Sequence, residues 1–293
     1  MKKIALIFLS TLLWAACKND LQEKNLPTKV QEETNKVVLV DTLKEFKTDI
    51  DITPPQHIEL KHQQLVEKED EKDAIGPLLK DERFLKETDS YVLDFNYPFL
   101  NEAWKPTHQN FNHYISKEYL NISEIEAQIL EDKELLCDTL RIHQIREKRL
   151  VNYKVYQVNE QLLSVLFYKE NYYSGAMHPA FTFDCLNFDL ERGVFMTYED
   201  FFIQGSEEEL RNILNETLSG KIQKGDVFYD CWDITSDDFF RYKNNFVVDD
   251  QRVEYYFEDC VICPSYTGQY SVEIPLEKLL PVLRRYHLNP LKF

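Results

Sequence analysis

Several stretches of the chain alternate large apolar residues with polar ones, a period of two that is typical of β-strands with one buried face. These patterns predict strands at residues 91–97, 151–158, 161–168, 181–190, 246–248, 253–257 and 270–274. Two neighbouring pairs, 151–158 with 161–168 and 246–248 with 253–257, are separated only by short turns rich in Asn and Asp. We therefore predict two β-hairpins.

Apolar residues spaced three or four positions apart predict four helices. In a capping box, Ser or Thr at the helix start and Glu three residues later satisfy each other's backbone N–H groups. The predicted starts are Thr107, the capping boxes Ser123/Glu126 and Ser206/Glu209, and Pro275.

The order of these elements predicts the fold class. Strands gather in hairpins, and regular β-α-β alternation, which would indicate a parallel sheet, is lacking. We predict an α+β fold with antiparallel sheets and segregated helices. Because the folded part is longer than one average domain, we expect two adjacent small α+β domains, at 56–170 and 171–293.

The first residues have the features of a secretory signal peptide. Lys2 and Lys3 precede an apolar run at 4–16, which is shorter than the roughly 20 residues of a membrane-spanning helix. Small residues lead directly into Cys17, and this ending resembles the bacterial lipobox, in which the cysteine is acylated and becomes the new N-terminus. The resemblance implies a signal peptide at 1–16 and lipid attachment at Cys17. An ordinary signal peptide cleaved nearby is the alternative.

Residues 17–55 are dominated by charged and amide side chains. Low hydrophobicity with mixed charge is typical of a solvated linker, so we expect a lipid anchor followed by a polar tether. Lys18 favours the outer membrane under the sorting rule of enteric bacteria. The expected location is therefore the bacterial cell envelope, with the protein lipid-anchored.

Charge narrows the range of partners. The chain has 51 Asp and Glu against 34 Lys and Arg, a formal net charge of −17. This charge repels nucleic acid, which we exclude as a partner. Hydrophobic residues make up 43% of the chain, enough to bury a sizeable core, so wholesale disorder is also excluded.

Two stretches resemble an uncharacterised extracytoplasmic bacterial domain family. They contain Gly-x-x-His-Pro at 175–179, Asn-Phe-Asp-Leu at 187–190, Glu-Asp-Phe-Phe at 199–202 and Ile-Pro-x-x-x-Leu at 274–279. That domain forms the C-terminal part of the lysozyme-binding anti-sigma factor and accompanies some peptidoglycan deacetylases. The resemblance implies an envelope-facing α+β module that binds a protein in at least one member. This chain lacks the membrane-spanning helix of an anti-sigma factor, so we do not expect sigma-factor regulation.

Beyond Cys17 the chain has an odd number of cysteines, so at least one is free or paired between molecules. They are Cys137, Cys185, Cys231, Cys260 and Cys263. The Cys-x-x-Cys at 260–263 has no second such pair to complete a zinc site, and it lacks the βαβ context of a thioredoxin-like redox motif. We favour a structural disulfide among Cys231, Cys260 and Cys263, or a plain buried thiol, over redox or metal chemistry. No metal or cofactor is expected.

His178 lies in a predicted loop beside Tyr172 and Tyr173. Histidine can act as a general base, but an enzyme also needs a nucleophile, a metal or an oriented partner. The sequence contains none of the common nucleotide, protease or hydrolase motifs, so we favour a turn histidine and assign no catalytic residue. Exposed tyrosines are good interface residues. Tyr172, Tyr173, His178 and Tyr266 are therefore the ligand-binding candidates.

The favoured hypothesis is a non-enzymatic, lipid-anchored envelope protein of binding or sensing type. Its expected partner is a cationic protein such as lysozyme, which an acidic chain attracts, or a cell-wall ligand. The alternatives are a cell-wall-modifying enzyme that uses His178 and a scaffold subunit of an envelope complex.

Overall fold

The structure is a computed structural model that describes residues 65, 68, 70, 71, 78–135, 146–174, 176, 178–227, 229–284, 289 and 291. All of these residues belong to one structural unit, Ile52–Phe293. The predicted signal peptide, the tether, Cys17 and Cys137 lie outside the described residues. Those assignments stay predictions from the sequence.

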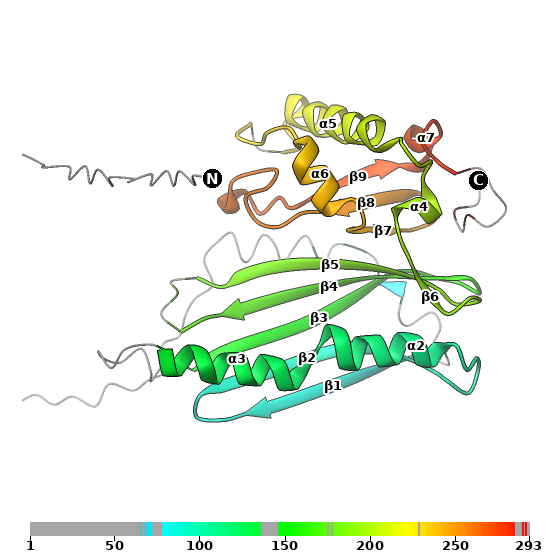
Figure 1. Cartoon of the computed structure of the whole chain (residues 1–293). Helices are drawn as coiled ribbons and strands as arrows, with labels where there is room; N and C mark the ends of the chain where they lie inside the picture. Colours follow the sequence, from blue (N-terminus) through cyan, green and yellow to red (C-terminus); the bar gives the residue numbers. More distant parts are fainter. Residues whose placement is uncertain are drawn as a thin grey trace, which may run out of the picture. The chain divides into compact units, whose positions relative to one another are not determined.

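A six-stranded sheet forms the first part of the unit (Figure 1). Its strands neighbour one another in chain order, and every pair is antiparallel except β2 and β3, which are parallel. The strands are β1 (Leu79–Glu87), β2 (Tyr91–Leu100), β3 (Glu147–Val158), β4 (Leu162–Tyr172), β5 (Ala180–Asp189) and β6 (Val194–Met196). A parallel pair needs a crossover, which is made by α2 (His108–His113), the π-helical segment η2 (Tyr114–Tyr119) and α3 (Ile122–Leu135).

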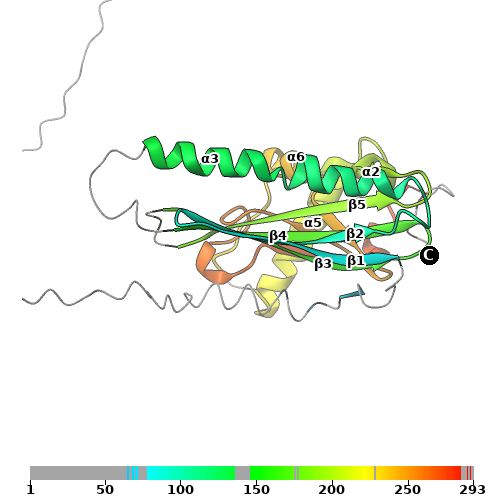
Figure 2. The ribbon, with the colours of Figure 1, turned by 90° about the horizontal axis from the view of Figure 1, so that it is seen from below.

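The crossover helices cover one face of the six-stranded sheet (Figure 2). Every second residue of a strand points to the same face, and the apolar residues on this face pack against the helices. The resulting core contains Leu93, Phe95, Val151, Val155, Val165, Phe167 and Phe188 from the strands, and Phe111, Ile115, Leu120 and Ile129 from the helical layer. Burial of each large side chain of this kind contributes about 1.5–3 kcal/mol.

A three-stranded antiparallel sheet has the order β7-β8-β9. Its strands are β7 (Phe246–Val248), β8 (Arg252–Tyr256) and β9 (Ser271–Pro275). Helices α4 (Tyr198–Phe201), α5 (Glu207–Lys224), α6 (Ser236–Tyr242) and α7 (Leu276–Leu279) accompany this sheet, together with a short 3₁₀ turn, η4 (Ser265–Thr267). Helices and strands share a core that includes Phe201, Phe202, Leu214, Phe239, Phe246, Tyr255 and Ile274.

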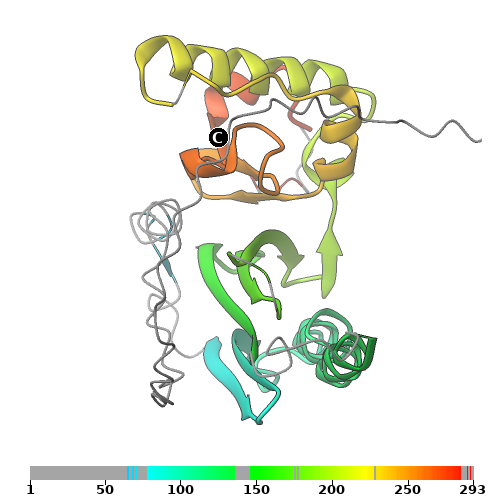
Figure 3. The ribbon, with the colours of Figure 1, turned by 90° about the vertical axis from the view of Figure 1, so that its left-hand side faces the viewer.

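The three-stranded sheet packs on the face of the six-stranded sheet opposite α3 (Figure 3). Phe183 of β5 stacks on Tyr270, with ring centroids 4.0 Å apart. The amide of Asn187 on β5 donates from Nδ2 to the backbone oxygen of Phe246 at 2.8 Å. Because buried polar groups require partners, this bond fixes the alignment of the two sheets as well as their contact. The layers are therefore helices, six-stranded sheet, three-stranded sheet and helices.

The predicted α+β fold with antiparallel sheets and segregated helices is confirmed. The seven predicted strands correspond to β2, β3, β4, β5, β7, β8 and β9. The sequence pattern did not predict β1, because this strand is exposed at almost every position and lacks apolar alternation. The short strand β6 and the parallel β2–β3 pair were not predicted either.

Neither of the two predicted capping boxes is formed. Helix α3 begins at Ile122, so the capping box predicted at Ser123 is wrong. Asn121 precedes the helix with φ 30° and its backbone oxygen accepts from the first turn, so the helix starts before Ser123. Ser206 precedes α5 as predicted, but it makes no side-chain cap. Its Oγ donates instead to the backbone oxygen of Ile203 at 2.6 Å.

The point between residues 170 and 171, where we expected a domain boundary, lies inside β4. That strand pairs with β3 on one side and β5 on the other. Residues up to Met196 complete the first sheet. The chain then passes from β6 to α4 and the second layer of helices (Figure 1).

Candidate functional site

Two loops carry the predicted ligand-binding residues, and both lie at the same end of the unit. The β4–β5 loop holds Tyr173 and His178, and the loop between β8 and β9 holds Tyr266. Phe183, near the start of β5, stacks on Tyr270, just before β9. This stack places the two loops at the end of the fold where β4 finishes and β5 begins (Figure 1).

A buried arginine sets the conformation of the β4–β5 loop. Arg149 and Glu147 lie two positions apart on β3, so their side chains project from the same face. Arg149 Nη2 donates to Glu147 Oε2 at 2.8 Å, and both side chains are buried. The ring of Tyr173 lies over the guanidinium, with 3.8 Å from Cζ to the ring centroid, a cation–π contact. The backbone N–H of Ser174 donates to Glu147 Oε1 at 3.4 Å.

Tyr172 also makes an intramolecular contact. Its hydroxyl donates to Glu170 Oε2 at 3.1 Å. Burial and then the charge of Glu170 raise the pKa of Tyr172 to about 12. The phenol therefore stays protonated at neutral pH and remains a donor to Glu170. Tyr172 and Tyr173 thus both have structural partners within the fold.

His178 is exposed. Its Nδ1 lies 3.3 Å from the backbone oxygen of Pro179, the type of contact that a turn histidine makes. Among the residues that the structure describes, no three His, Cys, Asp or Glu side chains gather into a group that could hold a metal ion. In the same part of the chain, no helix is both long enough and apolar enough to cross a membrane.

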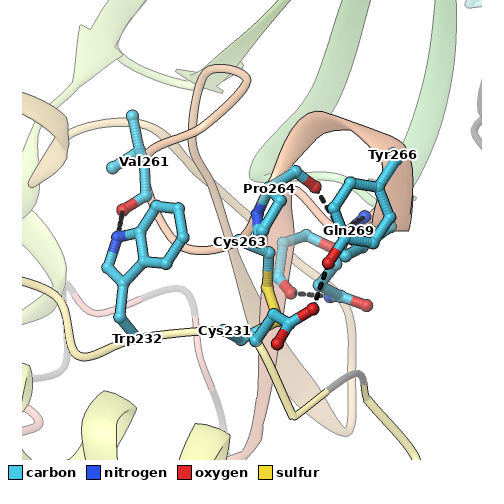
Figure 4. Close-up of a disulfide and its surroundings, with 10 residues drawn as sticks. Cys231, Trp232, Val261, Cys263, Pro264, Tyr266 and Gln269 are labelled. Atoms are coloured by element: carbon cyan, nitrogen blue, oxygen red, sulfur yellow. Dashed lines mark hydrogen bonds between the residues drawn. A yellow bond between two sulfur atoms is a disulfide. The ribbon is translucent and has the colours of Figure 1, made fainter.

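A disulfide joins Cys231 to Cys263, with Cα atoms 4.1 Å apart (Figure 4). It connects the segment before α6 to the loop between β8 and β9. Cys260, the other member of the Cys-x-x-Cys sequence, is exposed and free, and Cys185 is buried and free. Burial raises the pKa of the Cys185 thiol well above its ordinary value, which makes this thiol unreactive.

Three exposed aromatic residues lie around the disulfide, and we call them the aromatic surface. Tyr229 is 83% exposed, Trp232 43% and Tyr266 54%. Trp232 and Tyr266 lie on either side of the disulfide (Figure 4). Trp232 Nε1 donates to the backbone oxygen of Val261 at 2.7 Å, and the Tyr266 hydroxyl donates to Asp230. Each of these bonds ties the polar end of a ring to the fold.

Carboxylates accompany the aromatic surface. Asp233 and Glu258 are exposed, and Asp230 and Asp259 are partly exposed. The hydrogen bond to Asp230 raises the pKa of Tyr266, so this hydroxyl stays protonated beside the carboxylate. The surface is therefore both aromatic and negatively charged.

Of these three residues, the sequence predicted only Tyr266 as a ligand-binding candidate, and Tyr229 and Trp232 were not considered. The structure brings these three together, whereas Tyr172 ends β4, and Tyr173 and His178 lie in the β4–β5 loop. A usable signal was present at 229–232, where two aromatic residues flank Asp230 and Cys231. A disulfide within a loop, such as Cys231–Cys263, fixes the loop while the residues next to the cysteine in the sequence can remain exposed.

Comparison with protein-family models and with curated proteins gives no match. Among solved structures, a protein from Pseudomonas aeruginosa PAO1 matches with a TM-score of 0.50 and 12% identity, over 71% of this chain and 95% of its own. It is a DUF3298-family protein. A DUF3298-family member from Bacteroides fragilis matches with a TM-score of 0.45 and 15% identity, over 70% of this chain and 94% of its own.

The DUF3298-family likeness concerns the fold. At these identities it carries no ligand, activity or partner to this chain. The relation to the C-terminal domain of the anti-sigma factor stays a prediction from the sequence motifs.

Proposed function

We propose that this chain is an extracytoplasmic binding protein, lipid-anchored to the bacterial envelope through Cys17, and that the aromatic surface is its binding face. The observation that carries the proposal is the Cys231–Cys263 disulfide, which holds the exposed Trp232 and Tyr266 on cross-linked loops. Pre-ordered aromatic side chains offer a large contact area and lose little conformational entropy on binding.

The charge of this face favours a cationic protein, such as lysozyme, as the partner. Aromatic ring faces attract the cationic groups of Lys and Arg. The exposed carboxylates of Asp233 and Glu258 would steer a positively charged surface toward the rings. A cell-wall glycan could stack on the same rings, but it would gain little from these charges. Dependence on salt therefore separates the two ligands.

The disulfide also supports the export that the N-terminal sequence predicts. Disulfides persist in oxidising compartments outside the cytoplasm. Palmitate labelling of cells that express the protein tests the anchor, and a Cys17→Ser change should abolish the label. Label that persists in this variant would contradict the lipid attachment.

Binding can be tested with the purified protein and immobilised lysozyme in low and high salt. Trp232→Ala and Tyr266→Ala should each weaken binding by tenfold or more, since loss of a central aromatic anchor typically costs about 2 kcal/mol or more. Trp104→Ala is the matched control, because Trp104 is 57% exposed in the turn between β2 and α2. Absence of saturable binding, or equal losses at Trp104 and Trp232, would contradict this choice of partner and face.

The enzyme alternative has its own readout. Peptidoglycan fragments incubated with the protein should be recovered unchanged by mass spectrometry. A product that forms with the native protein and disappears with His178→Ala would favour catalysis over binding.

A further inference from the structure

A cavity lies on the face of the six-stranded sheet that meets the three-stranded sheet. Its volume is about 450 Å³, within the range of roughly 300–1,000 Å³ that is usual for small-molecule sites. Its walls come from β3, β4 and the segment before β1. The polar lining residues are Lys68, Asp70, Asn152, Lys154, Tyr168 and Glu170.

Lys154 places a buried positive charge at this cavity. Its Nζ donates to the backbone oxygen of Leu65 at 2.6 Å, and among the described residues it belongs to no ion pair. An ammonium group has three N–H donors, so two remain for a ligand. Burial lowers the pKa of Lys154, and the nearby Asp70 counteracts part of this effect. A buried charge outside an ion pair is costly, and an anionic ligand group would relieve that cost.

Carboxylates supply the opposite charge around the same space. Asp70 and the buried Glu170 line the cavity. Glu254 on β8 is 1% exposed. Lys68 Nζ lies 3.2 Å from Glu254 Oε2, so this lysine connects the cavity to the buried carboxylate.

The hydroxyl of Tyr168 provides a neutral group between these charges. The structure records no hydrogen bond for it among the described residues. Burial, followed by the charges of Glu170 and Asp70, raises the pKa of Tyr168. The phenol therefore lies near both carboxylates and stays protonated at neutral pH, when it can donate to a ligand.

We infer that this cavity binds a small zwitterion, a molecule that carries a carboxylate and an ammonium group, as amino acids and short peptides do. Lys154 binds the carboxylate, Glu170 and Asp70 bind the ammonium group, and the Tyr168 hydroxyl donates to the carboxylate. A zwitterion can place its carboxylate beside Lys154 and its ammonium group beside the carboxylates at the same time. A ligand with only one charge would bring that charge close to a like charge of the cavity, which is unfavourable.

The inference can be tested with the full chain by isothermal titration calorimetry. The probes are alanine, lysine and dialanine, and each is compared with its N-acetyl and its amide derivative. Comparison of alanine with dialanine separates a free amino acid from a peptide as the ligand. The N-acetyl form lacks the ammonium group, and the amide lacks the carboxylate. We expect at least one unmodified zwitterion to bind at least tenfold more tightly than either of its derivatives. No saturable binding of any zwitterion up to about 10 mM, weaker than the usual range of specific sites, would overturn the inference.

Two variants assign the charges. Lys154→Met should abolish the preference for the zwitterion over its amide, and Glu170→Gln should reduce the preference over the N-acetyl form. Lys148→Met is the matched control, because Lys148 is an exposed lysine on the same strand. A preference that survives Lys154→Met, or one that is lost equally in Lys148→Met, would overturn the assignment.

Tyr168→Phe keeps the ring and removes only the hydroxyl, so it tests the site even where a charge variant fails to fold. We expect an unchanged melting temperature and a roughly three- to tenfold weaker affinity, the usual effect of one lost hydrogen bond. Unchanged affinity would remove Tyr168 from the site. Trp232→Ala should leave zwitterion binding intact, so failure of the aromatic surface and failure of this cavity can be told apart.

Discussion

Removal of the Cys231–Cys263 disulfide has an effect on stability that can be worked out from the structure. Replacing both cysteines by serine leaves the folded contacts of the loops in place, including the bond from Trp232 Nε1 to Val261. The main change is in the unfolded chain, which gains freedom when the cross-link is absent. The folded state should therefore lose stability relative to the unfolded state.

The size of this loss depends on the length of chain that the bond closes. The two cysteines are separated by 32 residues in the sequence. The chain-entropy relation for a loop of this length gives about 12 cal/mol/K, or about 3.7 kcal/mol at 25 °C. Typical domains have unfolding free energies of roughly 5–15 kcal/mol, so the double variant should lose a large fraction of its stability.

Equilibrium urea unfolding, followed by circular dichroism and tryptophan fluorescence, measures this difference. Cys260→Ser is the matched control, because Cys260 is an exposed free thiol, and its change should stay within about 0.5 kcal/mol. A loss below about 1 kcal/mol in the double variant would refute the estimate from loop length. A larger loss in Cys260→Ser would show that Cys260 participates in the bond.

Three further perturbations test the packing and the charges. Lys68→Met removes the ammonium group that lies 3.2 Å from Glu254 Oε2 and also pairs with Glu273, and it should lower the unfolding free energy by about 3–5 kcal/mol. Adding Glu254→Gln should restore part of this loss in urea unfolding, and no restoration would contradict the pairing of Lys68 with Glu254. Phe183→Ala removes a buried side chain between the sheets and should lower the unfolding free energy, measured by calorimetry, by about 3–5 kcal/mol. A loss under about 1 kcal/mol would show that the packing of the sheets does not depend on this side chain. Burial tends to raise the pKa of Asp189, but hydrogen bonds and charge from Arg192 outweigh it and lower the pKa. This carboxylate therefore stabilises the fold at pH values above the pKa that Asp189 has in the unfolded chain, and the stabilisation is lost as pH falls through the lowered pKa of the folded state. The difference in unfolding free energy between the native protein and Asp189→Asn should therefore shrink from pH 7 to pH 3. A difference that grows over this range would contradict the reasoning.

How well the sequence predicted a strand depends on where that strand lies in its sheet. β3 and β4 are interior strands with buried faces, and burial of one face produces the alternation that the sequence displays. Among the strands of the described residues, β1 pairs with β2 alone, and its backbone hydrogen bonds leave no trace in the apolar pattern. The parallel contact of Tyr91 with Glu147 joins segments far apart in the chain, which local periodicity does not detect.

The candidate site was harder to predict because exposure of a loop residue depends on what lies beneath it. Tyr173 covers Arg149 and Tyr172 bonds to Glu170, and the positions of these strand residues relative to the loop come from the tertiary structure. The same holds for the cavity. In the sequence, Lys154 is an ordinary polar position of an alternating strand, and only the tertiary structure, which brings Leu65 against it, turns it into a buried charge.

The charged strand β1 has a consequence for the behaviour of many copies together. Six of its nine residues, in the sequence LKDERFLKE, carry a charge, and the strand forms one edge of the larger sheet. An open edge can accept a strand from another molecule and start aggregation, and closely spaced charges oppose this because they would have to give up water. At high protein concentration, copies of this chain should therefore resist joining to one another along this edge.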